Sequence, residues 1–443
     1  DGNSQLSAYE RKRLKNLTEN AKFFAALKLH EVWLRLINHV CNLEMFDSSR
    51  ARPKKVKEET VRRRSMRLQR IEPSGILMPE VPAQAEAEEY PQVPAGPLPM
   101  IPEDQAESSK LTEDLLVMWM SISEVFLATI SYMMLFRYRD NLSRMVLREE
   151  NIKKVVKSRV SSMAIHPSES ILFVAAGDKI GQIGLWNVDC KSEEGAHVFV
   201  PHNFLVSCMH FSPFNPAHLL SLSNETLRCG DVTRAVFDEI CRGEDLSSFA
   251  FLEDTASTAV VGHWDGKITL VDRRTPGTSP ELSADIGFKR TRTVHVHPVN
   301  KQYFLAAGSV DVCIYDVRCL KPTGNKPVST LKGHTKSVAS AYFSPVTGNR
   351  VVTVCADDML RHNNNTGRWL TRFQAVWDPK QEDCFVVGSM ARPRQIQVFQ
   401  DTGKLLHSFS NLDCLGSVCS INIVHPTKNI LVGGNSSGRL HVF

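Results

Sequence analysis

Residues 332–345 read Lys-Gly-His-Thr-Lys-Ser-Val-Ala-Ser-Ala-Tyr-Phe-Ser-Pro. The stretch opens on a Gly-His pair, continues as a short alternation of apolar and small residues, and ends on Ser-Pro. A period of two residues predicts a strand with one buried face, and the proline marks its end. Related phrases, most of them closed by His-Pro, Ser-Pro or Asp-Pro, recur at 160–167, 206–213, 246–253, 293–298, 372–379 and 417–426.

Further apolar segments of strand length follow these phrases. Second segments rich in small residues stand at 172–177 and 304–308, and third segments at 183–186, 268–272, 313–316, 396–399 and 440–443. The repeat of about 42 residues matches a four-stranded blade of a WD-type propeller. One blade cannot bury both faces of its sheet, so the blades must stack in a ring. The sequence therefore predicts an all-β fold, a seven-bladed WD-repeat β-propeller over 141–443.

Two features of the ring follow from the spacing of the repeats. The chain stops at Phe443, at the end of a third strand, so we expect residues 151–157 to supply the outer strand of the last blade. The interval between Pro345 and Pro379 is markedly shorter than that between Pro298 and Pro345. We therefore expect an incomplete fifth blade, with its third strand cut short and its fourth strand missing.

The N-terminal third is expected to form a helical and disordered extension. Apolar residues at helical spacing predict a helix over 5–29, which can continue to about residue 42, and we take 1–49 as this helical segment. Residues 50–70 carry ten Lys or Arg and two Glu, with clusters at Lys54, Lys55 and Lys57 and at Arg62, Arg63 and Arg64. Such clusters suit nuclear import receptors or phosphate backbones, the alternative being a solvated linker. Residues 71–109 are rich in proline and acidic residues, which completes a disordered linker over 50–110.

An apolar insert occupies 111–140. Its stretch 115–136 has the length of a membrane span, although Glu124 stands near its centre, where an ionisable group is costly. A buried helix, or translated sequence that is not normally part of the protein, fits this setting better than a membrane span. The first residue is Asp1 rather than methionine, which predicts a fragment of a longer protein.

Composition and motifs favour binding over catalysis. The chain has a net charge of +5 and eleven cysteines, which stand singly and predict reduced thiols. The sequence contains no Gly-rich phosphate loop, no nucleophile elbow and no His-Glu-x-x-His motif. His210, His295 and His297 alternate with apolar residues on first strands and are expected to be structural. We therefore expect a protein without catalytic residues, cofactor or metal.

Propeller topology sorts the basic residues onto one face. Loops before first strands and loops between second and third strands share one face, here called the basic face, and the remaining loops within each blade share the opposite face. Basic residues before first strands are Lys157, Arg159, Lys289, Arg290, Arg292, Lys332, Lys336, Arg368 and Arg372; those between second and third strands are Lys179, Lys267, Arg392, Arg394 and Arg439. Trp264 and Trp369 accompany them. A basic ring with aromatic side chains suits a phosphate backbone and a base that stacks, the alternative being ordinary charged loops.

The opposite face is predicted to carry two Asp-x-Arg boxes in adjacent blades. Asp272 and Arg274 end the third strand of unit three, and Asp316 and Arg318 end that of unit four. An Asp after a third strand is also ordinary capping and can pair with the Arg. These boxes resemble those of substrate receptors that dock on the damaged-DNA-binding adaptor of cullin-4 ubiquitin ligases.

Several longer phrases carry a family resemblance. Gly-His-Trp-Asp-Gly at 262–266, Gly-Arg-Trp-Leu-Thr-Arg-Phe-Gln at 367–374, Trp-Asp-Pro-Lys at 377–380 and Gly-Gly-Asn-Ser-Ser-Gly at 433–438 resemble the WD repeat-containing protein 76 family, which is related to the small subunit of the UV-damaged-DNA-binding complex. The resemblance implies a nuclear protein of the DNA-damage response that binds DNA through the propeller, reads modified cytosine such as 5-hydroxymethylcytosine, and associates with cullin-4. Residues 29–49 and 115–136 and the short fifth blade depart from the family, as an imperfect gene model or splice form would.

The sequence thus predicts a non-enzymatic DNA-binding propeller that is also the substrate receptor of a cullin-4 ligase. Its expected partners are DNA, the ligase through its damaged-DNA-binding adaptor, and other nuclear proteins, with no membrane partner. The alternative is an interaction scaffold whose basic face binds an acidic protein instead of DNA.

Overall fold

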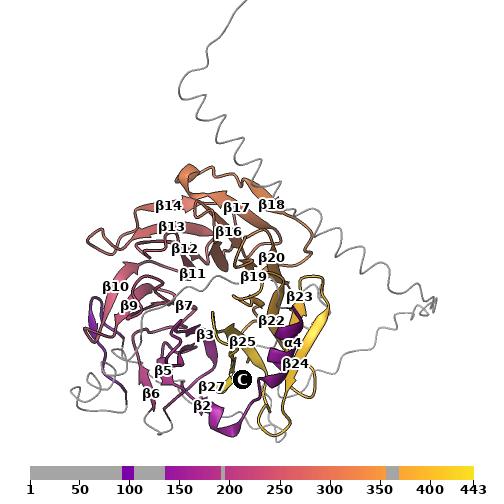
Figure 1. Cartoon of the computed structure of the whole chain (residues 1–443). Helices are drawn as coiled ribbons and strands as arrows, with labels where there is room; N and C mark the ends of the chain where they lie inside the picture. Colours follow the sequence, from indigo (N-terminus) through magenta and orange to yellow (C-terminus); the bar gives the residue numbers. More distant parts are fainter. Residues whose placement is uncertain (1–91, 104–134, 191–194, 356–368) are drawn as a thin grey trace, which may run out of the picture. The chain divides into compact units, whose positions relative to one another are not determined.

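The computed structural model describes residues 92–103, 135–190, 195–355 and 369–443. The chain divides into one unit of residues 1–36 with 93–443 and a second unit of residues 37–92. The described part of the first unit forms seven antiparallel sheets, which follow one another around a ring (Figure 1). The predicted β-propeller is therefore confirmed, with one sheet for each repeat phrase.

Strands run from the centre outwards in chain order within each blade. Blades one and two contain β3 (Val160–Ile165), β4 (Phe173–Asp178), β5 (Ile183–Asn187) and β6 (Ala196–Phe199), then β7 (Cys208–Phe211), β8 (His218–Leu222), β9 (Thr226–Asp231) and β10 (Val236–Arg242). Blades three and four contain β11 (Leu246–Phe251), β12 (Thr258–His263), β13 (Lys267–Asp272) and β14 (Leu282–Asp285), then β15 (Thr293–Val296), β16 (Tyr303–Ala307), β17 (Val312–Asp316) and β18 (Ser329–Leu331), with the short helix η4 (Val317–Cys319) between β17 and β18.

Blades five to seven complete the ring. Their strands are β19 (Val338–Phe343) and β20 (Val351–Cys355), then β21 (Val376–Trp377), β22 (Cys384–Ser389), β23 (Gln395–Gln400) and β24 (Leu405–Ser410), then β25 (Cys419–Val424), β26 (Leu431–Asn435) and β27 (Arg439–Val442). Outside β27 lies β2 (Ile152–Lys154), which follows η2 (Glu149–Asn151) and pairs Ile152 with His441. The predicted closing strand is thus confirmed. Blade five has two strands among the described residues, and the expected loss of its outer strands falls on 356–368, outside the described residues.

The repeat phrase has a local physical explanation. Alternating residues of the first strands point between neighbouring blades, where apolar clusters form; Leu305 of blade four, for example, packs in one cluster with Val338 and Phe343 of blade five. The histidine of the Gly-His pair reaches the second strand of its own blade, because His334 Nε2 lies 2.9 Å from Thr353 Oγ1. The phrase therefore encodes both the contact between blades and a polar bond within the blade.

Residues 92–103 differ from the prediction of a linker without a fold. They cross the outer edge of blade two, where β1 (Leu98–Pro99) pairs with β10 and Met100 is buried between blades one and two. Arg228, only 1% exposed, donates to the carbonyls of Gly96 and Pro94 at 2.7 and 3.0 Å. Composition alone could not reveal this strap, because its partners lie more than a hundred residues away.

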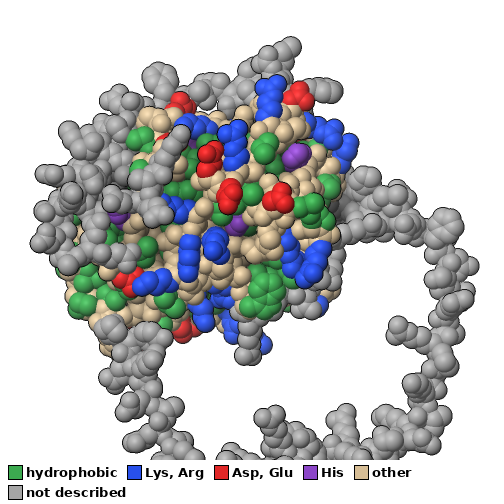
Figure 2. All heavy atoms as spheres, turned by 90° about the horizontal axis from the view of Figure 1, so that it is seen from below, with side chains coloured by type: hydrophobic (Ala, Val, Ile, Leu, Met, Phe, Trp, Pro, Cys, Tyr) green, Lys and Arg blue, Asp and Glu red, His purple; other side chains and the backbone are tan. Residues whose placement is uncertain are grey.

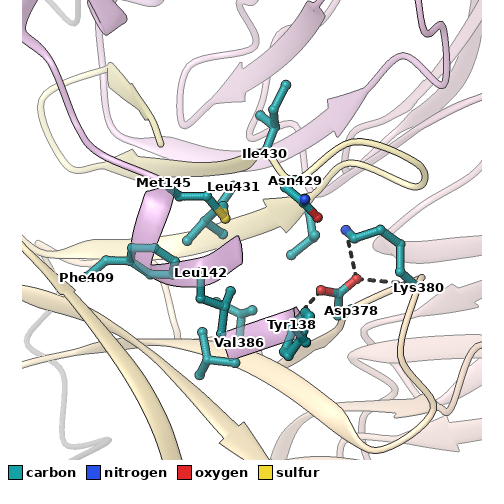
Figure 3. Close-up of a pocket in the computed structure, with 12 residues that line it drawn as sticks. Tyr138, Leu142, Met145, Asp378, Lys380, Val386, Phe409, Asn429, Ile430 and Leu431 are labelled. Atoms are coloured by element: carbon teal, nitrogen blue, oxygen red, sulfur yellow. Dashed lines mark hydrogen bonds and ion pairs between the residues drawn. The ribbon is translucent and has the colours of Figure 1, made fainter. Parts of the chain in front are cut away.

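The boundary expected at residue 141 also lies too far along the chain. Helix α4 (Leu135–Arg144) packs on blades six and seven through the buried side chains of Tyr138 and Leu142. Figure 3 shows the hydroxyl of Tyr138 directed at Asp378, to which it donates at 2.7 Å, while Lys380 Nζ lies 2.9 Å from the same carboxylate. The predicted helix over 5–29, the basic segment 50–70 and most of the apolar insert lie outside the described residues. Within those residues no helix is long and apolar enough to cross a membrane.

Candidate nucleic-acid interface

Strand register confirms how the loops divide between the two faces. Val160, at the start of β3, pairs with Asp178, at the end of β4, and Gly177 pairs with Ile183, at the start of β5. Residues before a first strand therefore lie at the same end of the blade as the loop between its second and third strands. The sequence positions assigned to the basic face consequently share one face, except Arg368, which lies outside the described residues.

Two glycines fix the loop that carries Arg290 and Arg292. Gly266 has a φ of +96°, and a Cβ there would lie 1.8 Å from the carbonyl oxygen of Phe288. Gly308 has a φ of +150°, and a Cβ there would lie 2.3 Å from the carbonyl oxygen of Arg290. The amide of Arg292 donates to the carbonyl of Ala307 at 2.7 Å. Close backbone approach, which glycine permits, thus wedges this loop between blades three and four.

Three arginines gather on this part of the basic face. The guanidinium carbon of Arg292 lies 5.9 Å from the ring centre of Trp264, which is the geometry of a cation–π contact. Arg372 of blade six reaches solvent, yet the protein packed around it and the positive charge of Arg290 lower the pKa of its guanidinium. Arg290 precedes the first strand of blade four, so this repulsion acts between residues of two blades that are not consecutive in the chain. None of the three forms an ion pair within the described part of the chain.

Other predicted contact residues lie on the same face as these arginines. Trp369, directly before blade six, is 53% exposed. Arg394 is partly buried and donates from Nη1 to the carbonyl of Met390 at 2.7 Å, which fixes its position. Further exposed basic side chains on the same face are Lys179, Lys289, Lys332, Lys336, Arg392 and Arg439.

The basic residues form an arc and do not close into the expected ring. Blade two contributes Glu225 to this face, and blade three contributes Glu244, Asp245 and Asp265. Lys267 Nζ lies 2.6 Å from Asp265, so its charge is compensated within its own loop. These acidic neighbours were not anticipated from the sequence. Figure 2, an edge-on view, shows Lys and Arg side chains mixed with acidic and apolar ones along the side of the propeller.

Both Asp-x-Arg boxes on the opposite face adopt the same geometry. Arg274 donates to Asp272 from Nε at 2.9 Å and from Nη2 at 2.6 Å, and Arg318 donates to Asp316 at 3.0 and 2.7 Å. Each aspartate also accepts the backbone amide of its arginine. The arginine side chains are 65% and 48% exposed. The boxes are therefore bidentate pairs whose outer guanidinium donors face solvent.

A third pair stands at the equivalent strand end of blade two and was missed in the sequence. Asp231 ends β9, and Arg234 donates to it from Nε at 2.8 Å and also pairs with Asp238. The arginine stands three residues after the aspartate, so the Asp-x-Arg spacing did not match. A broader pattern would have found this pair in the sequence: an Asp at the end of any third strand, followed by an Arg within one turn.

The histidines on the first strands are structural, as expected. His297 Nδ1 accepts the amides of Val299 and Asn300 at 3.2 and 2.9 Å, and burial lowers the pKa of His297 to about 4. His295 accepts the amide of Phe343, and burial lowers its pKa to about 3. Within the described ranges, no three His, Cys, Asp or Glu side chains group as metal ligands would.

The fold and its repeat phrases define a WD-repeat propeller protein. No protein-family model matches the sequence. WD repeat-containing protein 76 of Rhinolophus ferrumequinum is 52% identical to this chain, over 100% of the chain and 74% of the relative. The chain belongs to the WD repeat-containing protein 76 family.

More distant relatives are similar over about two thirds of the chain. DNA damage-binding protein CMR1 of Phaeosphaeria nodorum is 25% identical, with 68% of each chain covered. DNA damage-binding protein 2 of Oryza sativa is 26% identical, over 64% of this chain and 54% of the relative.

Proposed function

We propose that the protein is a nuclear, non-enzymatic DNA-binding propeller of the DNA-damage response, with DNA held on the basic face. The observation that carries the proposal is that strand register gathers exposed basic side chains on one face, where Arg290 and Arg372 are exposed and form no ion pair among the described residues. The names of the relatives from Phaeosphaeria nodorum and Oryza sativa, both DNA damage-binding proteins, point the same way.

The physical reason is electrostatic. Two guanidinium groups that repel each other in a partly dehydrated setting are stabilised by an anion that lies between them. A phosphodiester supplies one negative charge and oxygens that accept from both arginines. Trp264, whose ring lies beside Arg292, and the exposed Trp369 offer aromatic rings on the same face, and bases stack on such rings without regard to sequence.

The test is a salt titration of binding to a labelled DNA duplex. Wild-type affinity falls as salt rises, because each phosphate contact adds about 0.9 to the slope of log affinity against log salt. Replacing Lys289, Arg290 and Arg292 by Glu weakens binding and flattens this slope. If affinity and slope stay at wild-type values, the basic face binds an acidic protein or nothing, and the DNA proposal is wrong.

Selectivity for 5-hydroxymethylcytosine is the finer form of this proposal, and the family resemblance supports it. A base that leaves the duplex and stacks on Trp264 or Trp369 exposes its substituent to the surrounding polar groups. Duplexes that differ only in cytosine, 5-methylcytosine or 5-hydroxymethylcytosine test it directly. Equal affinities for the three duplexes contradict the selectivity and leave general DNA binding intact.

Docking on the cullin-4 adaptor is the second part of the proposal, and the opposite face supports it. The bidentate pairs hold Arg274 and Arg318 in fixed orientations, and their free donors suit carbonyl or carboxylate oxygens of a partner. DNA and ligase would then occupy separate faces, so that one chain holds both. Co-purification of the adaptor with wild-type protein, and its loss in the double Arg-to-Ala variant, is the expected result.

Nuclear location is proposed from the basic clusters of residues 50–70. Lys54, Lys55, Lys57, Arg62, Arg63 and Arg64 have the composition that import receptors bind. A fluorescent fusion that lacks residues 50–70 spreads into the cytoplasm if these clusters are the import signal. Continued nuclear accumulation assigns the signal to another part of the protein.

A further inference from the structure

An oxyanion site on the basic face is filled by a carboxylate of the chain itself. Glu103 accepts from Gln182 Nε2 at 2.7 Å and forms an ion pair with Lys157 Nζ. Gln182 is only 3% exposed, and its Oε1 accepts the amide of Lys157 at 3.0 Å. Its amide group is therefore held with the NH₂ directed at Glu103. The two donors, one buried and one charged, form a fixed pair.

The strap of residues 92–103 positions the carboxylate of Glu103. Met100 is buried, and its amide donates to the carbonyl of Ala235 at 2.7 Å. Three residues later, the amide of Glu103 donates to the carbonyl of Val198 on blade one at 2.9 Å. The position of Glu103 is thus set by backbone bonds and by Met100, and it does not depend on the ion pair with Lys157.

The site formed by Lys157 and Gln182 lies on the basic face. Lys157 precedes β3, and Gln182 lies in the loop between β4 and β5, so both stand at the basic-face end of blade one. In the same loop Lys179 is exposed, and its amide donates to the carbonyl of Arg159 at 3.1 Å. Lys157 and Gln182, which contact Glu103, thus lie on the same face of blade one as Lys179 and Arg159.

We propose that Lys157 and Gln182 form a phosphate subsite of the DNA-binding face, and that Glu103 is its internal competitor. The inference rests on the proposed DNA binding. Carboxylate and phosphodiester oxygens accept from the same ammonium and amide donors, and like charges exclude both anions from one site. The partner class is the sugar–phosphate backbone of a nucleic acid. DNA has to displace Glu103 from Lys157 before blade one contributes to binding.

The experiment compares Glu103→Gln with Glu150→Gln on a short labelled duplex over a range of salt. Glu150 pairs with Arg148 at 3.5 Å, both are well exposed, and β2 places them toward the other end of blade seven. Both substitutions change the net charge equally. Glu103→Gln raises affinity at low salt by about two- to five-fold, the scale of a partly exposed ion pair. It also steepens the salt slope by about 0.9, one added phosphate contact.

A double variant identifies the donor. Adding Lys157→Gln to Glu103→Gln cancels the gain in affinity and in slope, because the freed ammonium is then missing. If the gain persists without Lys157, or if Glu150→Gln gives the same gain, the subsite does not exist and the effect is one of overall charge. Thermal unfolding of each variant shows whether the propeller has stayed folded, and the buried Met100 keeps the strap in place for the comparison.

The outcomes separate this inference from the proposed function. If the wild type binds DNA in a salt-sensitive way that depends on Arg290 and Arg372, yet Glu103→Gln behaves like Glu150→Gln, only the subsite is wrong. If the wild type shows no salt-sensitive DNA binding at all, the proposed function and the subsite are both wrong.

Discussion

Arginines on the two faces of the propeller stand in opposite electrostatic situations. On the basic face, the protein packed around Arg372 lowers the pKa of its guanidinium, and the positive charge of Arg290 adds to the effect. On the opposite face, the hydrogen bonds that Arg318 donates to Asp316 raise the pKa of Arg318, and those that Arg274 donates to Asp272 raise the pKa of Arg274. Arg290 and Arg372 on the basic face therefore lack an ion-pair partner among the described residues, whereas Arg274 and Arg318 on the opposite face are already compensated.

The contrast separates two kinds of recognition. Uncompensated charge attracts a polyanion at a distance. It gives an affinity that depends on salt and does not require the partner to adopt one exact orientation. A paired arginine has lost most of its net field, but its planar fork is fixed in direction and can satisfy one specific acceptor. The first kind fits a phosphate backbone, and the second fits a protein surface.

Removing the paired arginines gives the largest expected effect. Changing Arg274 and Arg318 to Ala reduces affinity for the cullin-4 adaptor by about 30-fold or more, since partner acceptors buried in the interface are left unpaired. Affinity for DNA stays at the wild-type value. Titration calorimetry with purified adaptor measures the first, and the duplex assay measures the second. Unchanged adaptor binding by a folded variant places the docking site elsewhere.

Reversing the uncompensated charges tests the other half of the comparison. Arg290→Glu with Arg372→Glu lowers DNA affinity by about 100-fold at low salt, because two phosphate contacts become two repulsions. Arg274→Glu with Arg318→Glu changes the net charge by the same amount on the opposite face and serves as the control. Equal losses in the two double variants would falsify a face-specific DNA site.

Acid is expected to weaken the scaffold beneath both faces. Burial, with a smaller contribution from Arg228, lowers the pKa of His202 to about 3, and His202 bridges Ser221 and Thr226. A depressed histidine pKa means that the unfolded chain binds more protons below about pH 6.5. Stability is therefore full above that pH and is lost as the pH falls toward the folded pKa, by about 2 kcal/mol for this residue between pH 7 and pH 5. Urea unfolding at several pH values measures it, and His202→Gln flattens the dependence.

Replacing a compensated lysine on the basic face gives the smallest expected effect. Lys267→Gln changes DNA affinity by less than about two-fold, because Asp265 already neutralises this ammonium. The matched variant Lys289→Gln removes an exposed lysine from the neighbouring loop and lowers affinity further. A larger loss from Lys267→Gln than from Lys289→Gln would show that sequence position on the face matters more than local pairing.

Prediction from sequence succeeded where the information is local. The alternation around Ser340, the Gly-His pair at His334 and the prolines that end the first strands gave the blades and their faces. The Asp-x-Arg spacing also located Arg274 and Arg318, two of the three arginines that pair with an Asp at the end of a third strand in the described residues, since Asp and Arg meet within a single turn. Asp231 and Arg234 escaped because their spacing differs by one residue.

Long-range pairing accounts for what the sequence could not supply. Nothing near Lys157 in the chain indicates that Glu103 neutralises it, and nothing near Arg228 indicates that it holds the carbonyls of Pro94 and Gly96. Residues 92–103 read as a proline-rich linker because the edge of blade two that binds them is encoded elsewhere. The sequence did not indicate that the N-terminal part of helix α4 packs on the propeller. Tyr138 is held there by its hydrogen bond to Asp378 on blade six, which lies far away in the chain.

The sequence by itself determined the repeat, the closed ring and the face on which each loop lies, because strand alternation and turn chemistry act over a few residues. The tertiary structure alone decided which charged side chains are neutralised by an ion-pair partner and which can attract a ligand. Compensation depends on distances between side chains from different blades and from the strap, as with Arg290 beside Arg372 and Glu103 beside Lys157. Electrostatic energy falls with distance in space, and separation along the chain does not report that distance.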